Sequence, residues 1–156
     1  MAKHQARGLY FEEFEVDQVY VSTARTITES DIVAFAGLSG DYNQIHTDVE
    51  YGKQTPFGRR IAHGLLITSI ASGLLNLSGL IEGTVIAFRE IESWKFIKPV
   101  FIGDTIHVQS VITKTKAFKR LGSGAVDLEL SVLNQNEEVV MKGVFKVLIT
   151  SKPEEE

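Results

Sequence analysis

The chain has 156 residues, which suits one domain, and its 44% apolar and 23% charged residues are ordinary for a globular protein. The net charge of −4 argues against a general affinity for nucleic acid or anionic membranes, and the lack of cysteine excludes a disulfide framework, a thiolate nucleophile and thiolate metal sites. No apolar signal segment follows the basic residues 1–7, and the apolar run 65–80 is too short to span a membrane, so we expect a cytoplasmic protein.

The predicted organisation is a flexible arm over residues 1–8, a single domain over 9–150 and a disordered, charged tail over 151–156. Within the domain, weak alternation of apolar and polar residues over 19–26 indicates a strand. An amphipathic helix is expected next, over 29–38, because apolar residues recur there at helical spacing.

This helix has recognisable ends. Thr28 can cap its start, with Asp31 completing a capping box, and Gly40 can end it because glycine adopts the left-handed conformation without a Cβ penalty. The following stretch 40–46, Gly-Asp-Tyr-Asn-Gln-Ile-His, is polar and is expected to be an irregular loop.

Asp41 and His46 in this loop carry side chains that often move protons near neutral pH, and one short loop can bring them together. Such a pair suits the addition of water to a double bond, where one group takes a proton from water and a proton is delivered to carbon. The spacing is equally compatible with an Asx turn at Asp41 and a histidine bonded to backbone. Other motifs must therefore decide between these interpretations.

Residues 47–53 are expected to form one helical turn, and residues 54–60 a loop that ends in Arg59 and Arg60. Arginine pairs with phosphate through a fork of N–H donors, so this loop can contact a phosphate-bearing ligand. A solvated basic turn fits each arginine at least as well, and the sequence leaves both interpretations open.

The predicted central helix spans about 61–77 and carries apolar or small residues all round, which is typical of a buried helix enclosed by a sheet. His63 and Gly64 lie at its head, where helix N–H groups are unsatisfied and the helix dipole is positive. The Gly64 N–H can therefore stabilise an oxygen that gains negative charge. We expect His63 to bond to backbone and shape the loop, and Ser72 either to contact substrate or to permit close packing of the helix on the sheet.

Four strands are predicted after the helix, over 85–96, 104–115, 124–133 and 138–150. Turn residues separate them, and short links between long strands argue for antiparallel pairing. The basic run 114–120 is interpreted mainly as a charged rim that discourages edge pairing. No His, Asp or Glu cluster has convincing metal spacing, so no metal is expected.

Together these motifs resemble the MaoC-like dehydratases, the (R)-specific enoyl-CoA hydratase family. Residues 39–46 are similar to the family's signature loop, Gly-Asp-x-Asn-Pro-(aliphatic)-His, with Gln44 in place of the usual proline. Losing the fixed φ of proline leaves the loop freer, but both titratable side chains are kept. The resemblance covers about residues 8–150 and also includes the helix head His63–Leu66, the helical Ser72–Gly73, the turn Pro99–Asp104 and the opening Gly8–Val16.

The resemblance implies an α+β hot-dog fold, in which an antiparallel sheet wraps around one long helix, and the exposed sheet edges of such a fold imply a homodimer or larger homo-oligomer. It also implies a hydro-lyase without a cofactor, which reversibly hydrates a trans-2-enoyl thioester of coenzyme A or an acyl-carrier protein to the (R)-3-hydroxyacyl thioester. The implied roles are activation of one water by Asp41 and His46, a thioester-oxygen contact from the Gly64 N–H, support from Asn43, His63 and Ser72, and coenzyme A phosphate contacts from Arg59 and Arg60.

Two other functions stay compatible with the sequence. A hot-dog acyl-CoA thioesterase also uses a carboxylate and helix N–H groups. A non-catalytic acyl-binding subunit of a dehydratase complex would share the fold but lack the pair that Asp41 and His46 form. The residues do not indicate acyl chain length or branching, the carrier, the pathway, the oligomer order beyond a dimer, or which member of the pair is acid and which is base.

Overall fold

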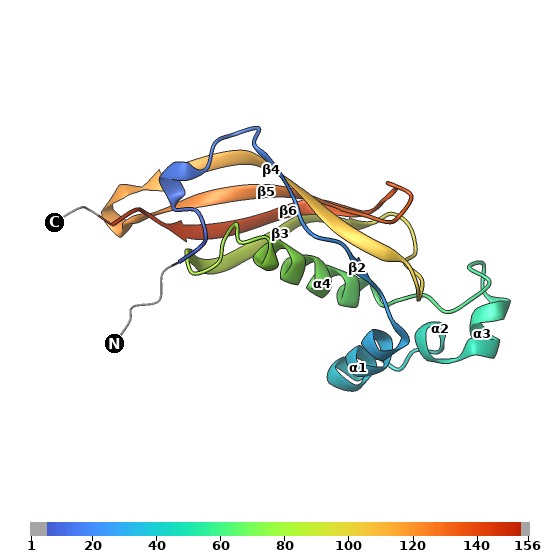
Figure 1. Cartoon of the computed structure of the whole chain (residues 1–156). Coiled ribbons are helices and arrows are strands. Elements are labelled where there is room, and N and C mark those ends of the chain that lie inside the picture. The colour runs from blue at the N-terminus through green and yellow to red at the C-terminus, as the bar shows by residue number, and fades with distance from the viewer. Residues whose placement is uncertain (1–5, 154–156) are drawn as a thin grey trace.

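The computed structural model describes residues 6–153, which form one antiparallel sheet with a long helix packed on one face (Figure 1). The sheet has six strands in the order β1-β4-β5-β6-β3, and β2 also pairs with β4. The strands are β1 (Val19–Val21), β2 (Arg25–Thr26), β3 (Val85–Phe96), β4 (Thr105–Phe118), β5 (Ser123–Leu133) and β6 (Val139–Thr150). Every pair of these strands is antiparallel, as the short predicted links require.

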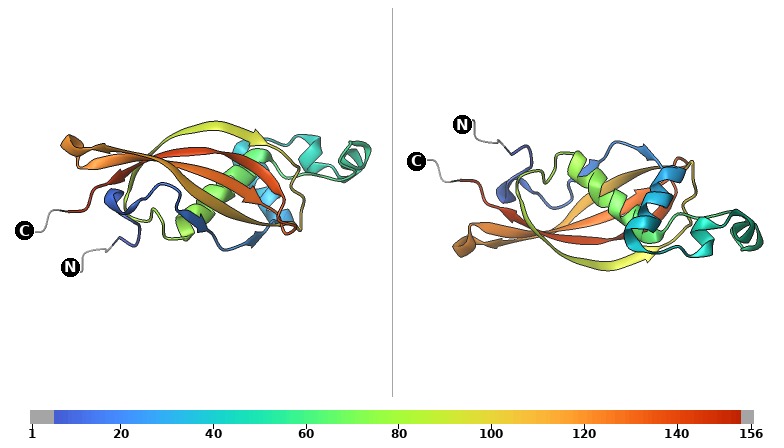
Figure 2. Two further views of the ribbon diagram at one scale, coloured as in Figure 1. Left: turned by 90° about the horizontal axis from the view of Figure 1, so that it is seen from above. Right: turned by 90° about the horizontal axis from the view of Figure 1, so that it is seen from below.

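Helix α4 (Gly64–Leu77) crosses one face of this sheet obliquely (Figure 2). Its sheet-facing side buries Ile67, Ala71 and Leu74 in one apolar cluster with the inward residues of the strands. On β5 every second residue belongs to this core, as Val126 and Leu128 do, because successive side chains of a strand point to opposite faces. The predicted hot-dog fold, a sheet around one helix, is therefore confirmed.

The central helix begins later than the sequence predicts. Ile61 and Ala62 are apolar and fit the helical pattern, but Ile61 pairs with Phe101 in an antiparallel bridge. Ala62 also donates its N–H to the Val100 carbonyl at 2.8 Å. This pairing holds the two residues extended, so the helix begins at Gly64 instead of residue 61.

The prediction that this helix is buried all round is also wrong. Leu65 and Leu77 are 65% and 70% exposed, and Ser69, Ser72 and Asn76 are exposed on the same helix. The reason is that the sheet covers only one side of α4, so its other side is open in the single chain.

Three helices lie beyond one end of the sheet: α1 (Glu29–Ser39), α2 (Gln44–Thr47) and α3 (Val49–Gln54) (Figure 1). The predicted helix over 29–38 is confirmed, and so are both of its ends. Thr28 accepts a hydrogen bond from the Asp31 N–H, the Asp31 carboxylate accepts one from the Thr28 N–H, and Gly40 adopts φ 77°. These ends fix the position at which Asp41 leaves the helix.

The stretch 40–46 is not irregular throughout, as the sequence predicts, because α2 begins within it. Asn43 Oδ1 accepts a hydrogen bond from the Ile45 N–H at 3.2 Å and so caps the helix that starts at Gln44. His46 therefore lies on a helical turn. The predicted single turn over 47–53 is replaced by α3, which runs to Gln54.

Several strand limits also differ from prediction. The predicted strand over 19–26 is two short strands, β1 and β2, that pair with different parts of β4. Strand β4 continues to Phe118 and β5 begins at Ser123, with a short 3-10 helix, Lys119–Leu121, between them. Residues 114–118 of the basic run pair with β5 on one side of β4. On the other side, β1 and β2 pair only with residues 109–111 and 105–106, so within the described chain the outer edge of the run has no strand partner, as a charged rim requires.

The beginning of the described chain is attached to the domain. Gly8, predicted to belong to a flexible arm, is buried and donates its N–H to the Glu82 carbonyl at 2.8 Å. Phe11 packs so closely on β5 that a Cβ at Gly124 would lie 2.2 Å from its ring. Residues 1–5 of the predicted arm and 154–156 of the predicted tail lie outside the described residues. No helix among those described is long and apolar enough to cross a membrane.

Candidate active site

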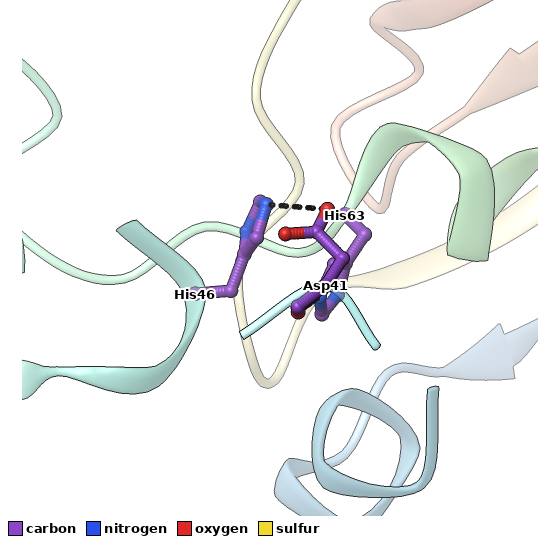
Figure 3. A group of neighbouring side chains, drawn as sticks. All are labelled: Asp41, His46 and His63. Atoms are coloured by element: carbon purple, nitrogen blue, oxygen red, sulfur yellow. Dashed lines mark hydrogen bonds and ion pairs between the residues drawn. The ribbon is translucent and has the colours of Figure 1, made fainter. Parts of the chain in front are cut away.

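The fold brings Asp41 and His46 together beside the start of α4 (Figure 3). The His46 Nε2 atom lies 3.9 Å from Asp41 Oδ2. Asp41 is oriented locally, because its Oδ1 accepts a hydrogen bond from the Asn43 N–H at 3.2 Å. The His46 side chain is buried, whereas that of Asp41 is half exposed. The carboxylate therefore lies between solvent and a sheltered imidazole.

The hydrogen bond made by His46 Nδ1 determines which nitrogen of the neutral ring carries the hydrogen. Nδ1 lies 2.8 Å from the Ile61 carbonyl, which can only accept, so Nδ1 carries the hydrogen and Nε2 of the neutral ring has a free lone pair. Burial lowers the pKa of His46 below its ordinary value and the neighbouring His63 also lowers it, while the bond to Ile61 and the charge of Asp41 act in the opposite direction. The neutral ring therefore presents a proton acceptor toward Asp41.

His63 links the two members of this pair. Its Nε2 donates a hydrogen bond to the Asp41 carbonyl at 2.9 Å, and its ring stacks on that of His46 with centroids 3.8 Å apart. Phe35 of α1 contacts the His63 ring edge-on, with the two ring centroids 5.0 Å apart. His63 is buried, and its Nδ1 has no hydrogen-bond partner among residues 6–153. The ring is thus fixed from three directions.

Gly64 is the first residue of α4, and the first N–H groups of a helix have no acceptor within the helix. A side chain at this position would force a movement of the ring or of the helix start, because a Cβ would lie 2.6 Å from the Phe96 ring. The first turn is held by Thr68, whose hydroxyl donates to the Gly64 carbonyl at 2.9 Å and accepts from Trp94 Nε1 at 3.0 Å. The helix start is therefore a rigid, bare group of N–H donors.

An open pocket of about 520 Å³ lies against His46 and Gly64. Most of its walls are apolar. Besides those two residues, they comprise Ile45, Phe57, Ile61, Ala62, Leu65, Phe96, Ile97, Lys98, Pro99, Val100 and Met141. Most of these wall residues carry no sequence signal, because they come from four separate segments that only the fold brings together. The pocket has the character expected of a site for an apolar group attached to a polar reactive centre.

The structure does not bring all predicted site residues to this pocket. Ser72 is exposed on α4, its hydroxyl donates to the Ser69 carbonyl at 2.7 Å, and it does not line the pocket. Arg59 and Arg60 line a separate, smaller pocket that also includes Lys53. Within the single chain, therefore, Asp41, His46, His63 and Gly64 form one group, and Ser72 is not part of it.

Asp41, His46 and His63 each place one possible metal-ligand atom within 4.8 Å of the others, a convergence that their spacing in the sequence does not reveal. A metal ion lies near the plane of each imidazole that binds it. Here the two rings are stacked with 28° between their planes, so their lone pairs run side by side and do not converge. His63 Nε2 is moreover bonded to a carbonyl. The arrangement favours proton transfer over metal binding.

The fold and this group of residues define a hot-dog protein with an acid–imidazole pair next to a helix start. Residues 13–134 match the family described as the MaoC like domain. The chain belongs to this family, the MaoC-like dehydratases, whose members include proteins named (R)-specific enoyl-CoA hydratase. The resemblance seen in the sequence is thereby confirmed.

Two relatives and one solved structure illustrate the similarity. The chain is 32% identical to 3-hydroxybutyryl-CoA dehydratase of Methylorubrum extorquens over 150 residues, which cover 96% of this chain and 90% of the relative. It is 42% identical to Protein MaoC of Klebsiella aerogenes over 100 residues, 64% of this chain, but spans only 29% of that protein. The structure of R-hydratase PhaJ1 from Pseudomonas aeruginosa aligns with a TM-score of 0.78 at 29% identity, covering 93% of this chain and 88% of that one.

Proposed function

We propose that the protein reversibly hydrates a trans-2-enoyl-CoA to the (R)-3-hydroxyacyl-CoA. The observation that carries the proposal is the Asp41–His46 pair, 3.9 Å apart, whose His46 lines an apolar pocket that also contains the free helix start at Gly64. Family membership supports hydro-lyase chemistry on acyl thioesters and the (R) configuration. A cytoplasmic location stays a prediction.

In the proposed mechanism one water molecule lies between the two side chains. Their separation of 3.9 Å allows one water to donate a hydrogen bond to Asp41 Oδ2 and another to His46 Nε2, since both atoms are acceptors. The water oxygen attacks C3 of the enoyl group, and one proton of the water passes to the pair. A proton from the pair then returns to C2, so the elements of one water molecule are added and the residues end in their initial state.

The charge that develops during attack lies on the thioester oxygen. When the C3–O bond forms, electrons of the double bond move toward that oxygen and give it enolate character. The Gly64 N–H, at the positive end of α4, is the proposed donor to this oxygen. His63 and Asn43 position Asp41: His63 donates a hydrogen bond to the Asp41 carbonyl, and the Asn43 N–H donates one to the Asp41 carboxylate. In this mechanism, His63 and Asn43 therefore need not contact the substrate.

The direct test is an assay of purified protein with crotonyl-CoA. Hydration removes the conjugated double bond, so its absorbance should fall until equilibrium is reached, without release of free thiol. Thiol release with the double bond intact would instead identify a thioesterase. Binding of the thioester without either change would identify an acyl-binding subunit, and both of these results would contradict the proposal.

Gly64→Ala should reduce kcat for hydration by about 10²-fold, the usual cost of displacing a catalytic group by about 1 Å. The added Cβ would lie 2.6 Å from Phe96, so the ring or the helix start must move. Gly73→Ala is the matched control on the same helix, because a Cβ at Gly73 meets no atom within 4 Å in the described part of the chain. Its kcat should equal that of wild type. Equal rates in both variants would contradict the prediction that the added Cβ displaces the helix start.

We also propose that the protein is a homodimer in which β3 and the open side of α4 meet a second copy. Strand β3 is a sheet edge of 12 residues, and its Ile86, Phe88 and Ile91 are 54%, 48% and 44% exposed. A long apolar edge readily pairs with another strand. Sedimentation should give the mass of a dimer for wild type, and Ile91→Lys should shift the equilibrium toward monomer. A monomeric wild type at micromolar concentration would contradict this proposal.

A further inference from the structure

The two adjacent arginines after Gly58 have different environments. Arg60 donates through Nη1 and Nη2 to both carboxylate oxygens of Glu29, at 2.8 and 2.7 Å, and its side chain is only 15% exposed. The hydrogen bonds from Arg60 lower the pKa of Glu29, as expected for a carboxylate in a fork-to-fork pair. Arg60 therefore fastens the start of α1 to the segment that leads into α4 and has few donors left for a ligand.

Arg59, unlike Arg60, packs its guanidinium against an aromatic ring and not against a carboxylate. Its guanidinium lies 3.8 Å above the centre of the Phe101 ring, so the cation is held in place by the aromatic face. Within residues 6–153 it makes no hydrogen bond or ion pair, although Arg7, Arg25 and Arg60 each have a carboxylate partner. Stacking leaves the N–H groups at the rim of the guanidinium free. Arg59 is thus a positioned cation whose donors all remain available.

The surroundings of Arg59 form a second pocket of about 210 Å³, which also contains Lys53 and the backbone turn at Gly58. The Lys53 amine pairs with Glu50 at 2.7 Å, but both side chains are mostly exposed, so this pair is weak and can open. No carboxylate residue lines this pocket. A ligand here would meet Arg59 and Lys53, besides Arg60, which is bound to Glu29, and no acidic side chain at the pocket wall.

The second pocket adjoins the active-site pocket along two chain segments. Phe57 and Ile61 line the active-site pocket, whereas residues 58–60 between them line the second one. On the facing segment, residues 96–100 line the first pocket and Ile102 the second, and the Ile61–Phe101 bridge joins the two segments. A substrate with its acyl group at His46 would therefore need only to extend along this bridge to reach Arg59.

We propose that Arg59, assisted by Lys53, binds a phosphate group on the pantetheine carrier of the substrate. This inference rests on the proposed function, because it places the acyl thioester in the pocket at His46. The planar fork of arginine matches phosphate oxygens, and its stacking on Phe101 reduces the entropy lost when the ligand binds. Coenzyme A and acyl-carrier protein both bear a phosphate on pantetheine, so the shared chemistry is an organic phosphate.

The test compares wild type and Arg59→Gln with three crotonyl thioesters, those of coenzyme A, 4′-phosphopantetheine and pantetheine. Arg59→Gln should raise KM for crotonyl-CoA about tenfold with kcat unchanged, the usual size of one lost charge-assisted hydrogen bond to a ligand. It should not change KM for crotonyl-pantetheine, which has no phosphate. If KM for crotonyl-4′-phosphopantetheine also rises, Arg59 binds the phosphate that both carriers share. If only KM for crotonyl-CoA rises, Arg59 binds a phosphate of its nucleotide part.

Arg120→Gln is the matched control, because Arg120 is an exposed arginine without a carboxylate partner in the described chain and lies in the distant turn between β4 and β5. Its KM values should equal those of wild type for all three thioesters. The inference is overturned if Arg59→Gln leaves KM for crotonyl-CoA unchanged, or if it raises KM equally for crotonyl-pantetheine. If wild type turns over none of the thioesters, the proposed function fails, and calorimetric titration of both proteins with coenzyme A still tests the site: equal affinities would overturn it.

Discussion

Asp41→Asn should lower kcat for the hydration of crotonyl-CoA by about 10²–10⁴-fold, the range in which a general acid or base contributes to catalysis. Asparagine has nearly the same shape as aspartate and can still accept the Asn43 N–H, which lies 3.2 Å from Asp41 Oδ1. It cannot accept a proton from water, and its amide group would present donors to His46. The loss should therefore fall on kcat and leave substrate binding almost intact.

The fold of this variant should be unchanged, because the Asp41 side chain is half exposed and its carbonyl bond to His63 is independent of the side chain. Circular dichroism and the melting temperature provide the check. Asp48→Asn is a matched control, since Asp48 caps α3 at the surface through a bond to the Tyr51 N–H and does not line the pocket. An Asp41→Asn protein with wild-type kcat would exclude the carboxylate from the chemistry.

His46→Ala should cause a loss in the same range, about 10²–10⁴-fold in kcat, because it removes the Nε2 lone pair that faces Asp41. Unlike Asp41, His46 is buried, and its removal leaves the Ile61 carbonyl without its hydrogen-bond donor. The free energy of unfolding should therefore also fall, by about 1–3 kcal/mol. Rates must be measured at a temperature where the variant is fully folded.

The matched control for this variant is His107→Ala. His107 lies on β4, with its Nε2 at 3.7 Å from Glu137, and is not part of the pocket wall. Its substitution should leave the hydration rate unchanged. If His46→Ala retains most of the wild-type kcat while folded, the imidazole is only a packing group, and a different residue must accept the proton.

The sequence predicts the proximity of Asp41 and His46 better than the pocket walls around them. This proximity could be predicted because the two residues belong to a short local motif that local hydrogen bonds shape. The pairing of His63 with both of them could not be identified, because it depends on how α4 packs against the loop. The same applies to Phe96, which reaches Gly64 from a strand far along the chain.

The errors in the predicted fold have a common physical cause. Apolar periodicity does not distinguish a helix from a short extended segment. The sequence therefore predicts Ile61 and Ala62 in the central helix, although backbone pairing with residues 100–101 holds them extended. The same periodicity does not reveal whether an apolar side chain is covered within one chain or by a second copy. Leu65 and Leu77 are exposed in the single chain, on the surface proposed to meet a partner.

The Asp41–His46 separation of 3.9 Å supports joint action on one water molecule, and a double-mutant cycle tests that claim most directly. The kcat of crotonyl-CoA hydration is measured for wild type, Asp41→Asn, His46→Ala and the double variant. If both side chains act on the same water, the double variant should be about as slow as the slower single variant, because either change already abolishes the shared step. Losses that multiply, so that the double variant is slower by the product of the two single effects, would show that the two residues act independently and would contradict the mechanism.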